Sequence, residues 1–262
     1  MTNDFQNYRQ QIYTDKAMID VLPSHRFYEL SQHLSNYQGV DILPLTQNNE
    51  LLTGSIKDKI IKSKPIKGKP IKKCQNLLNN HFLPQACVLI VITDENCPKL
   101  LLTRRSYHLN SHAGEVSLVG GKRDDADLNS IGVALREAYE EVGLASKDVT
   151  VLGYLPMQVS KSGLLVRPVV ACVSPSVADG LTSNPDEIAR IFWLPIDVLN
   201  APPADYVFDG QADNTKLHTP AWVYDCNDDG QVEVIWGLTG RILASLMEIG
   251  FGVRHEWYYK VR

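Results

Sequence analysis

The sequence predicts a domain of the α/β (α+β) class, in which strands flank a central helix. Strand-like apolar runs occupy residues 86–93 and 100–105, before a strongly patterned helix that follows residue 129. Further strand-like runs, separated by Gly, Pro and Ser, follow that helix at residues 149–157, 164–173 and 190–199. The chain has 262 residues, of which 44% are hydrophobic, so it can bury a sizeable core.

The first 80 residues are expected to lie outside this domain, which is assigned to residues 81–262. Residues 1 to about 50 are polar, with short helical patterns such as SHRFYELSQHL. Residues 56–73, IKDKIIKSKPIKGKPIKK, are rich in lysine and punctuated by proline. This composition predicts a solvated linker, and the alternative is a basic arm that attracts a polyanion.

The remaining elements follow in order along residues 81–262. The run ACVLIVIT predicts a buried strand, DENCPK a turn and LLLTRR a second strand, so the three together predict a hairpin. Near the C-terminal end, VEVI predicts a strand, and LTGRILASLMEIGF predicts an amphipathic helix.

Charge and cysteine content exclude several classes of protein. The net charge is −4 and the pI is about 6.0, which gives no general attraction to nucleic acid. No apolar run approaches the roughly 18 residues of a membrane span, and the first residues lack a signal-peptide core. Five cysteines without a CxxC pair indicate reduced thiols. We therefore expect a cytoplasmic protein without membrane contact, and the choice between monomer and homodimer stays open.

The helix after residue 129 is predicted by its caps and its apolar stripe. Asn129 or Ser130 can cap its start, and Gly143 stands where a left-handed residue ends a helix. The stripe consists of Ile131, Leu135, Ala138 and Val142.

The opposite face of this helix places three carboxylates side by side near its C-terminal end. Glu137, Glu140 and Glu141 follow i, i+3 and i+4 spacing, with Arg136 adjacent to them. The helix dipole disfavours anions at this end, and the like charges repel one another. A divalent cation would remove both conflicts.

Two glycines precede the helix, separated from it by the acidic loop KRDDAD. Gly120 and Gly121 allow the backbone to approach a phosphate or to turn a carbonyl toward a metal; for Gly120 a simple turn is the alternative. Magnesium binds through carboxylates together with substrate phosphates. Asp124 and Asp127 are expected to organise the loop or to cap the helix in preference to binding metal.

Residues 119–144 resemble the Nudix box, a motif of the form G-x5-E-x7-R-E-U-x-E-E-x-G-U with U aliphatic. The motif matches at Gly121, Arg136, Glu137, Glu140, Glu141, Gly143 and Leu144. Asp127 replaces the first Glu, and one extra residue precedes Arg136. The resemblance implies an α/β/α sandwich with a mixed sheet, in which the box forms a loop-helix-loop. It also implies that Arg136 positions metal ligands, namely Glu137, Glu140, Glu141 and the Gly120 carbonyl.

With both departures, the chain resembles one branch of the family, the coenzyme A diphosphatases. That branch carries an upstream motif, L-L-T-x-R-S-x3-R-x3-G-x3-F-P-G-G, and this chain reads LLTRRSYHLNSHAGEVSLVGG. Asn110 replaces an Arg, while Leu118 and Val119 replace Phe and Pro. By this resemblance the substrate is bound by Arg105, Ser106, Asn110, His112, Gly114 and Gly121. Glu187 is either a metal ligand or general base, or a plain loop acid.

The leading hypothesis is an enzyme that uses Mg²⁺ or Mn²⁺ to cleave coenzyme A-like substrates to 3′-phosphoadenosine 5′-phosphate and 4′-phosphopantetheine. A second hypothesis is a Nudix hydrolase of another nucleoside diphosphate derivative, such as a dinucleotide or a nucleotide sugar. A third is a catalytically silent module that senses a nucleotide or binds a partner. The intact set of three glutamates argues against the third.

Overall fold

The computed structural model describes residues 27–36, 84–127, 129–209, 216–226 and 232–255. The lysine-rich segment 56–73 lies outside these ranges, so its role as a linker or basic arm stays a prediction. Four helices are described in these ranges, together with two short 3₁₀ turns, η3 (Ser146–Asp148) and η4 (Ile196–Asn200). The helices are α3 (Tyr28–Asn36), α6 (Ser130–Val142), α7 (Pro175–Asp179) and α8 (Gly237–Phe251).

Eight strands of the described residues form a mixed sheet. In chain order they are β1 (Ala86–Thr93), β2 (Lys99–Arg105), β3 (Val116–Ser117), β4 (Val119–Lys122), β5 (Thr150–Tyr154), β6 (Gln158–Val159), β7 (Leu165–Val173) and β8 (Ile188–Pro195). The main path runs β3-β2-β1-β7-β5, with β8 paired to β2, β4 to β1 and β6 to β7. Strands β1 and β7 are parallel, and the other pairs are antiparallel.

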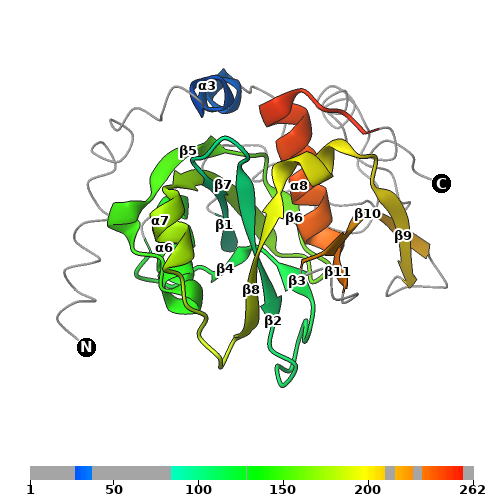
Figure 1. Cartoon of the computed structure of the whole chain (residues 1–262). Helices are drawn as coiled ribbons and strands as arrows, with labels where there is room; N and C mark the ends of the chain where they lie inside the picture. The colour runs from blue at the N-terminus through cyan, green and yellow to red at the C-terminus, as the bar shows by residue number, and fades with distance from the viewer. Residues whose placement is uncertain (1–26, 37–83, 128, 210–215, 227–231, 256–262) are drawn as a thin grey trace, which may run out of the picture.

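A second sheet contains three strands of the described chain. It consists of β9 (Ala204–Asp209), β10 (Lys216–Asp225) and β11 (Val232–Ile235), with β10 in the centre. Helix α8 follows β11 and packs against β10. This hairpin-rich sheet therefore connects the main sheet to the C-terminal helix, as Figure 1 shows.

Alternation along the central strands separates two hydrophobic cores. On β1, Cys87, Leu89 and Val91 face the core that contains α6, whereas Ile90 and Ile92 face the core that contains α8 and α3. Helices therefore cover both faces of the sheet (Figure 1), which confirms the expected α/β/α architecture. In the part of the chain described, no helix combines the length and apolar character needed to cross a membrane.

Helix α3 comes from the region that the sequence assigns to an N-terminal extension, yet it packs on the domain. Phe27, Leu30 and Leu34 are buried in the core with α8. The Ser31 hydroxyl donates to the Leu152 carbonyl at 3.1 Å, and this bond fixes α3 against β5. The boundary near residue 80 remains a prediction, but these ten residues belong with the core of the domain.

Most predicted elements are observed, with shifted ends. The hairpin of β1 and β2 is confirmed by its antiparallel pairing. The strand predicted at 149–157 ends at Tyr154, and the one predicted at 190–199 spans Ile188–Pro195 before continuing as η4. Gly120 and Gly121 lie within β4 and pair with β1. Among the cysteines described, Cys87 and Cys172 are buried and Cys97 is exposed, all as free thiols.

Candidate active site

Local signals explain why α6 begins and ends where it does. The Asn129 side chain accepts a hydrogen bond from the Gly132 N–H at 2.7 Å, and Gly143 takes the left-handed conformation with φ of 71°. The predicted apolar stripe is buried against the sheet: Ile131, Leu135, Ala138 and Val142. This packing directs the glutamates toward one edge of β4 and the end of β2.

Arg136 connects the acidic loop before α6 to the glutamates of that helix. Its guanidinium donates to both carboxylate oxygens of Asp127, at 2.9 and 3.2 Å, and to the Lys122 carbonyl at 3.0 Å. The same side chain lies 2.9 Å from a carboxylate oxygen of Glu137 and 2.9 Å from one of Glu140. One nearly buried cation therefore ties the acidic loop to two of the three helical carboxylates.

Glu141 is the most enclosed of these carboxylates, with 2% of its surface exposed. Its Oε2 accepts a hydrogen bond from the Gly120 N–H at 3.1 Å, and its Oε1 lies 3.9 Å from Nη1 of Arg105. Burial raises the pKa of Glu141 to about 8; the Gly120 hydrogen bond opposes this rise, and the charges of Glu137 and Glu187 add to it.

Glu137 shares this environment. Burial raises the pKa of its carboxyl group, Arg136 lowers it, and the charges of Glu140 and Glu187 raise it further. Gly121 faces this carboxylate so closely that a Cβ atom there would overlap Glu137. Gly120 has φ of 147°, and a Cβ atom there would overlap the Cys87 carbonyl of β1. The two glycines thus allow β4 to pair with β1 while the Glu137 carboxylate lies against it.

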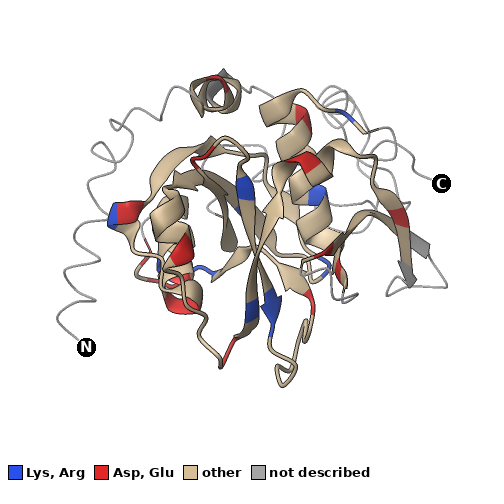
Figure 2. Cartoon of the chain, in the orientation of Figure 1, with Lys and Arg blue, Asp and Glu red and all other residues tan. Residues whose placement is uncertain are grey.

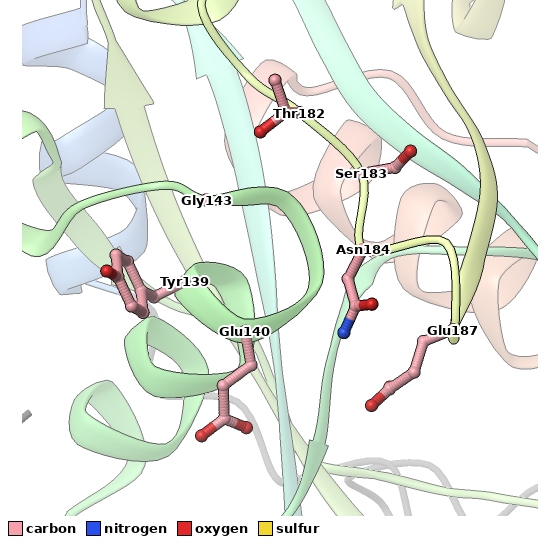
Figure 3. A pocket seen from close by; sticks show the side chains of 7 residues that line it. All are labelled: Tyr139, Glu140, Gly143, Thr182, Ser183, Asn184 and Glu187. Carbon is pink, nitrogen blue, oxygen red and sulfur yellow. The ribbon is translucent and has the colours of Figure 1, made fainter. Parts of the chain in front are cut away.

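Residues 182–187 bring a further carboxylate to the site. The Thr182 N–H donates to the Val142 carbonyl at 3.2 Å, and the Asn184 N–H donates to the Glu141 carbonyl at 2.8 Å. A pocket of about 640 Å³ lies between this segment and the end of α6, lined by Tyr139, Glu140, Gly143, Thr182, Ser183, Asn184 and Glu187. Figure 3 shows Glu140 and Glu187 on its two sides.

Two residues predicted to bind substrate lie at the end of β2. Arg105 is adjacent to Glu141, and its buried Nε has no hydrogen-bond partner in the described structure. Ser106 is buried, and its hydroxyl donates to the Pro185 carbonyl at 3.0 Å. The structure therefore places the Arg105 guanidinium at the carboxylates, while Ser106 fastens the segment that contains Glu187. Substrate contact by either residue stays a prediction.

Of the other predicted substrate residues, Gly121 lies in β4, and the remaining three lie in the turn between β2 and β3. The Gly114 N–H donates to the Arg105 carbonyl at 3.2 Å, which closes the turn. His112 has φ of 53°, and its Nδ1 lies 2.8 Å from Oε2 of Glu115. Asn110 is exposed in the same turn. These three residues extend beyond the end of β2, and their role toward a substrate stays a prediction.

The donor set has the chemistry of a divalent-cation site but is not arranged as a closed cluster. Among the residues described, no group of three or more His, Cys, Asp or Glu side chains is positioned to hold a metal ion. A physical reason is that Glu137 and Glu140 both bind Arg136. The guanidiniums of Arg105 and Arg136 nevertheless face four carboxylates, those of Asp127, Glu137, Glu140 and Glu141, and the charge of a fifth, Glu187, acts on Glu137 and Glu141. This excess of negative charge fits a bound Mg²⁺ or Mn²⁺.

Charged residues are segregated around this region. Figure 2 shows acidic residues on α6 and basic residues at one end of β2 and β8.

Sequence reasoning did not identify Asn184, although the Asn-Pro dipeptide that it begins is a turn signal. It also missed the ion pair between Arg104 of β2 and the buried Glu233 of β11, which joins residues 129 positions apart.

Comparison with known proteins identifies the family of the chain. The NUDIX domain family matches residues 83–212. "Uncharacterized Nudix hydrolase NudL" of Pectobacterium atrosepticum is 38% identical over 166 residues, covering 63% of this chain and 82% of the relative. The protein of that name from Escherichia coli K12 is 36% identical over 174 residues, with 63% and 83% covered. A solved structure of a C. elegans Ap4A hydrolase binary complex aligns with 43% of this chain and 80% of that chain, at 17% identity and a TM-score of 0.37. By its relationship to the curated relatives, the chain belongs to the Nudix hydrolase family.

Proposed function

We propose that the protein is a cytoplasmic, Mg²⁺- or Mn²⁺-dependent diphosphohydrolase that cleaves the pyrophosphate of coenzyme A or its derivatives. The products would be 3′-phosphoadenosine 5′-phosphate and 4′-phosphopantetheine. The observation that carries this proposal is the buried Glu141 carboxylate, because burial opposes its charge and only the Gly120 N–H and the Arg105 guanidinium at 3.9 Å offset it. A binding module has no need for buried carboxylates with raised pKa values.

The residues of the site have different roles in the proposed reaction. A pyrophosphate repels an incoming nucleophile, and a bound divalent cation supplies charge neutralisation and acidifies a bound water. Glu137 and Glu141 would hold that cation, with Glu140 and Glu187 on the pocket side. Arg136 orients the helical carboxylates through its own hydrogen bonds. Arg105 presents a cation to the diphosphate, and Glu187 is a candidate general base.

The coenzyme A assignment rests on the motif at residues 101–121. In the structure this stretch runs through β2, the following turn, β3 and β4, so it contacts Glu141 at both of its ends. Arg105 approaches Glu141 from one end, and Gly120 donates to it from the other. Leu118 and Val119, which replace Phe and Pro, are buried in the two cores on opposite faces of the sheet. They support β4 without facing the pocket.

The test is a screen of the purified protein against coenzyme A, dephospho-coenzyme A, a dinucleoside polyphosphate, ADP-ribose and a nucleotide sugar, each with Mg²⁺ and Mn²⁺. We expect coenzyme A to be cleaved only when metal is present. Glu140→Gln or Glu141→Gln should reduce turnover by at least about two orders of magnitude, because each removes a carboxylate from the proposed site. Near-normal turnover by both variants would refute the assignment of these residues.

Asn110 favours a second candidate function, hydrolysis of another nucleoside diphosphate derivative. The exposed Asn110 supplies no positive charge where the coenzyme A branch has an Arg. A substrate without a 3′-phosphate would not need that charge. Higher kcat/KM for ADP-ribose or a dinucleotide than for coenzyme A in the same screen would select this second candidate.

A further inference from the structure

The segment after α7 is fastened to the last turn of α6 through the N–H groups of Thr182 and Asn184, and Asn184 makes the shorter bond. Its N–H donates to the Glu141 carbonyl at 2.8 Å, and its own carbonyl accepts from the N–H groups of Glu187 at 3.1 Å and Ile188 at 2.8 Å. Asn184 therefore has direct hydrogen bonds to the backbone of Glu141 on one side and to the backbone of Glu187 on the other. Both of these residues carry carboxylates of the candidate active site.

The side chain of Asn184 stabilises the same turn. Its Oδ1 accepts a hydrogen bond from the Asp186 N–H at 3.1 Å, a local turn that Asn forms readily. Because the amide NH₂ group only donates and the Asp186 N–H needs an acceptor, this contact fixes which atom of the amide is the oxygen. The nitrogen then faces the pocket, between Glu140 and Glu187, as Figure 3 shows.

Ser106 holds the segment from its other side. The Ser106 N–H donates to the Glu187 carbonyl at 2.8 Å, and its hydroxyl donates to the Pro185 carbonyl at 3.0 Å. Since Ser106 follows Arg105 at the end of β2, these bonds connect Glu187 to the strand whose arginine approaches Glu141. The turn at 184–187 is thus fixed by α6 and by β2 together.

We propose that Asn184 is a positioning residue that holds the Glu187 carboxylate opposite Glu141, so that both face one divalent cation. This inference rests on the proposed function, because it assigns Glu187 to the same metal-dependent site. The geometry supports it, since the Asn184 backbone is hydrogen-bonded to the backbones of both Glu141 and Glu187. Ser106 acts in the same way through the backbone of Glu187.

The test compares Asn184→Ala, which removes the side-chain acceptor, with Asn184→Ser, which keeps a hydroxyl acceptor at the turn. Binding of Mn²⁺ alone is measured by electron paramagnetic resonance and calorimetry, without substrate. Loss of a partner that orients a metal ligand weakens metal affinity by about 10- to 100-fold, so Asn184→Ala should raise the Kd for Mn²⁺ by about tenfold. Asn184→Ser should recover most of that loss.

Steady-state kinetics at saturating Mn²⁺ give a second readout, with the diphosphate that the wild-type protein cleaves best. We expect Asn184→Ala to lower kcat by about tenfold or more, with little change in KM, because a displaced Glu187 affects the reaction more than substrate binding. Ser106→Ala should give the same pattern. Asn200→Ala is the matched control, because Asn200 is exposed on η4 and its side chain bonds only Asp197 among the contacts described.

The outcomes separate this inference from the proposed function. If the wild-type protein binds Mn²⁺ but does not cleave coenzyme A, the assignment of coenzyme A as substrate is refuted. The Mn²⁺ affinities of the variants then still test the role of Asn184. Unchanged Mn²⁺ affinity and kcat in Asn184→Ala would overturn the positioning role. Equal losses in Asn184→Ala and Asn184→Ser would also overturn it. If Asn184→Ala does not fold, the Mn²⁺ affinity and kcat of Ser106→Ala and Asn184→Ser test the positioning role instead.

Discussion

Replacing Glu141 by Gln should stabilise the metal-free protein at neutral and mildly alkaline pH, even as it removes activity. Glu141 is 2% exposed, and burial is the largest cause of its raised pKa. Gln has the same shape and can still accept the Gly120 hydrogen bond through its carbonyl oxygen. The substitution thus removes a buried charge without leaving a cavity.

The sign and size of this stabilisation follow from the pKa of Glu141 in the unfolded state and its pKa in the folded protein. Its ordinary pKa is 4.5, and in the folded protein it is about 8. Between these pH values the folded state keeps the proton and the unfolded state releases it, so the free energy of unfolding falls as pH rises. The interval from 4.5 to about 8 corresponds to about 5 kcal/mol at 1.36 kcal/mol per pH unit. This value is an upper limit for Glu141→Gln, because it counts the whole interval between the two pKa values.

Urea unfolding in the presence of EDTA, at pH 5 and at pH 8.5, measures this effect. The stability of Glu141→Gln relative to wild type should rise by several kcal/mol between the two pH values. Glu140→Gln is the control on the same helix, since its side chain is 36% exposed and pairs with Arg136, and it should show no such gain. A relative stability of Glu141→Gln that is the same at both pH values would refute the reasoning. Adding Mn²⁺ should stabilise wild type more than the variant.

Three further predictions concern neighbouring positions. Gly121→Ala should lower kcat by about tenfold or more, because its Cβ would displace the Glu137 carboxylate; unchanged kcat would contradict this. Glu233→Gln should cost about 3 kcal/mol in urea unfolding, since it leaves Arg104 without its buried partner, whereas a loss below about 1 kcal/mol would mean that the pair is dispensable. Asn110→Arg should improve kcat/KM for coenzyme A over dephospho-coenzyme A by about 1 kcal/mol, and equal effects on both would show that position 110 does not contact the 3′-phosphate.

The helix of the site could be predicted in detail because its signals are local. Asn129 at the start, Gly143 at the end and the buried stripe between them all act within one element. The strands of the central sheet were predictable for a similar reason, since β1 and β7 are nearly continuous apolar runs buried on both faces. Strand β4 was not expected, because two of its four residues are glycines.

The connections between elements could not be predicted from the sequence. Asn184 acts through backbone groups, and a backbone N–H carries no residue-specific signal. Ser106 was assigned to substrate from its motif, but its hydroxyl donates to a carbonyl 79 residues away. The helical pattern of α3 is visible in the sequence, but its place in the core depends on β5 and α8, which it contacts only after folding.

The acidic end of α6 shows how one sequence feature acquires two roles. The carbonyls of Glu141 and Val142, which would repel an anion at a helix C-terminus, are hydrogen-bonded to Asn184 and Thr182. Arg136 compensates Glu137 and Glu140. Glu141 is left with a distant contact to Arg105 and a single backbone donor, in a buried position that opposes its ionisation. The same segment that neutralises the helix end brings Glu187 toward Glu141. The unfavourable charge that remains is therefore concentrated at one point, where a divalent cation would relieve it.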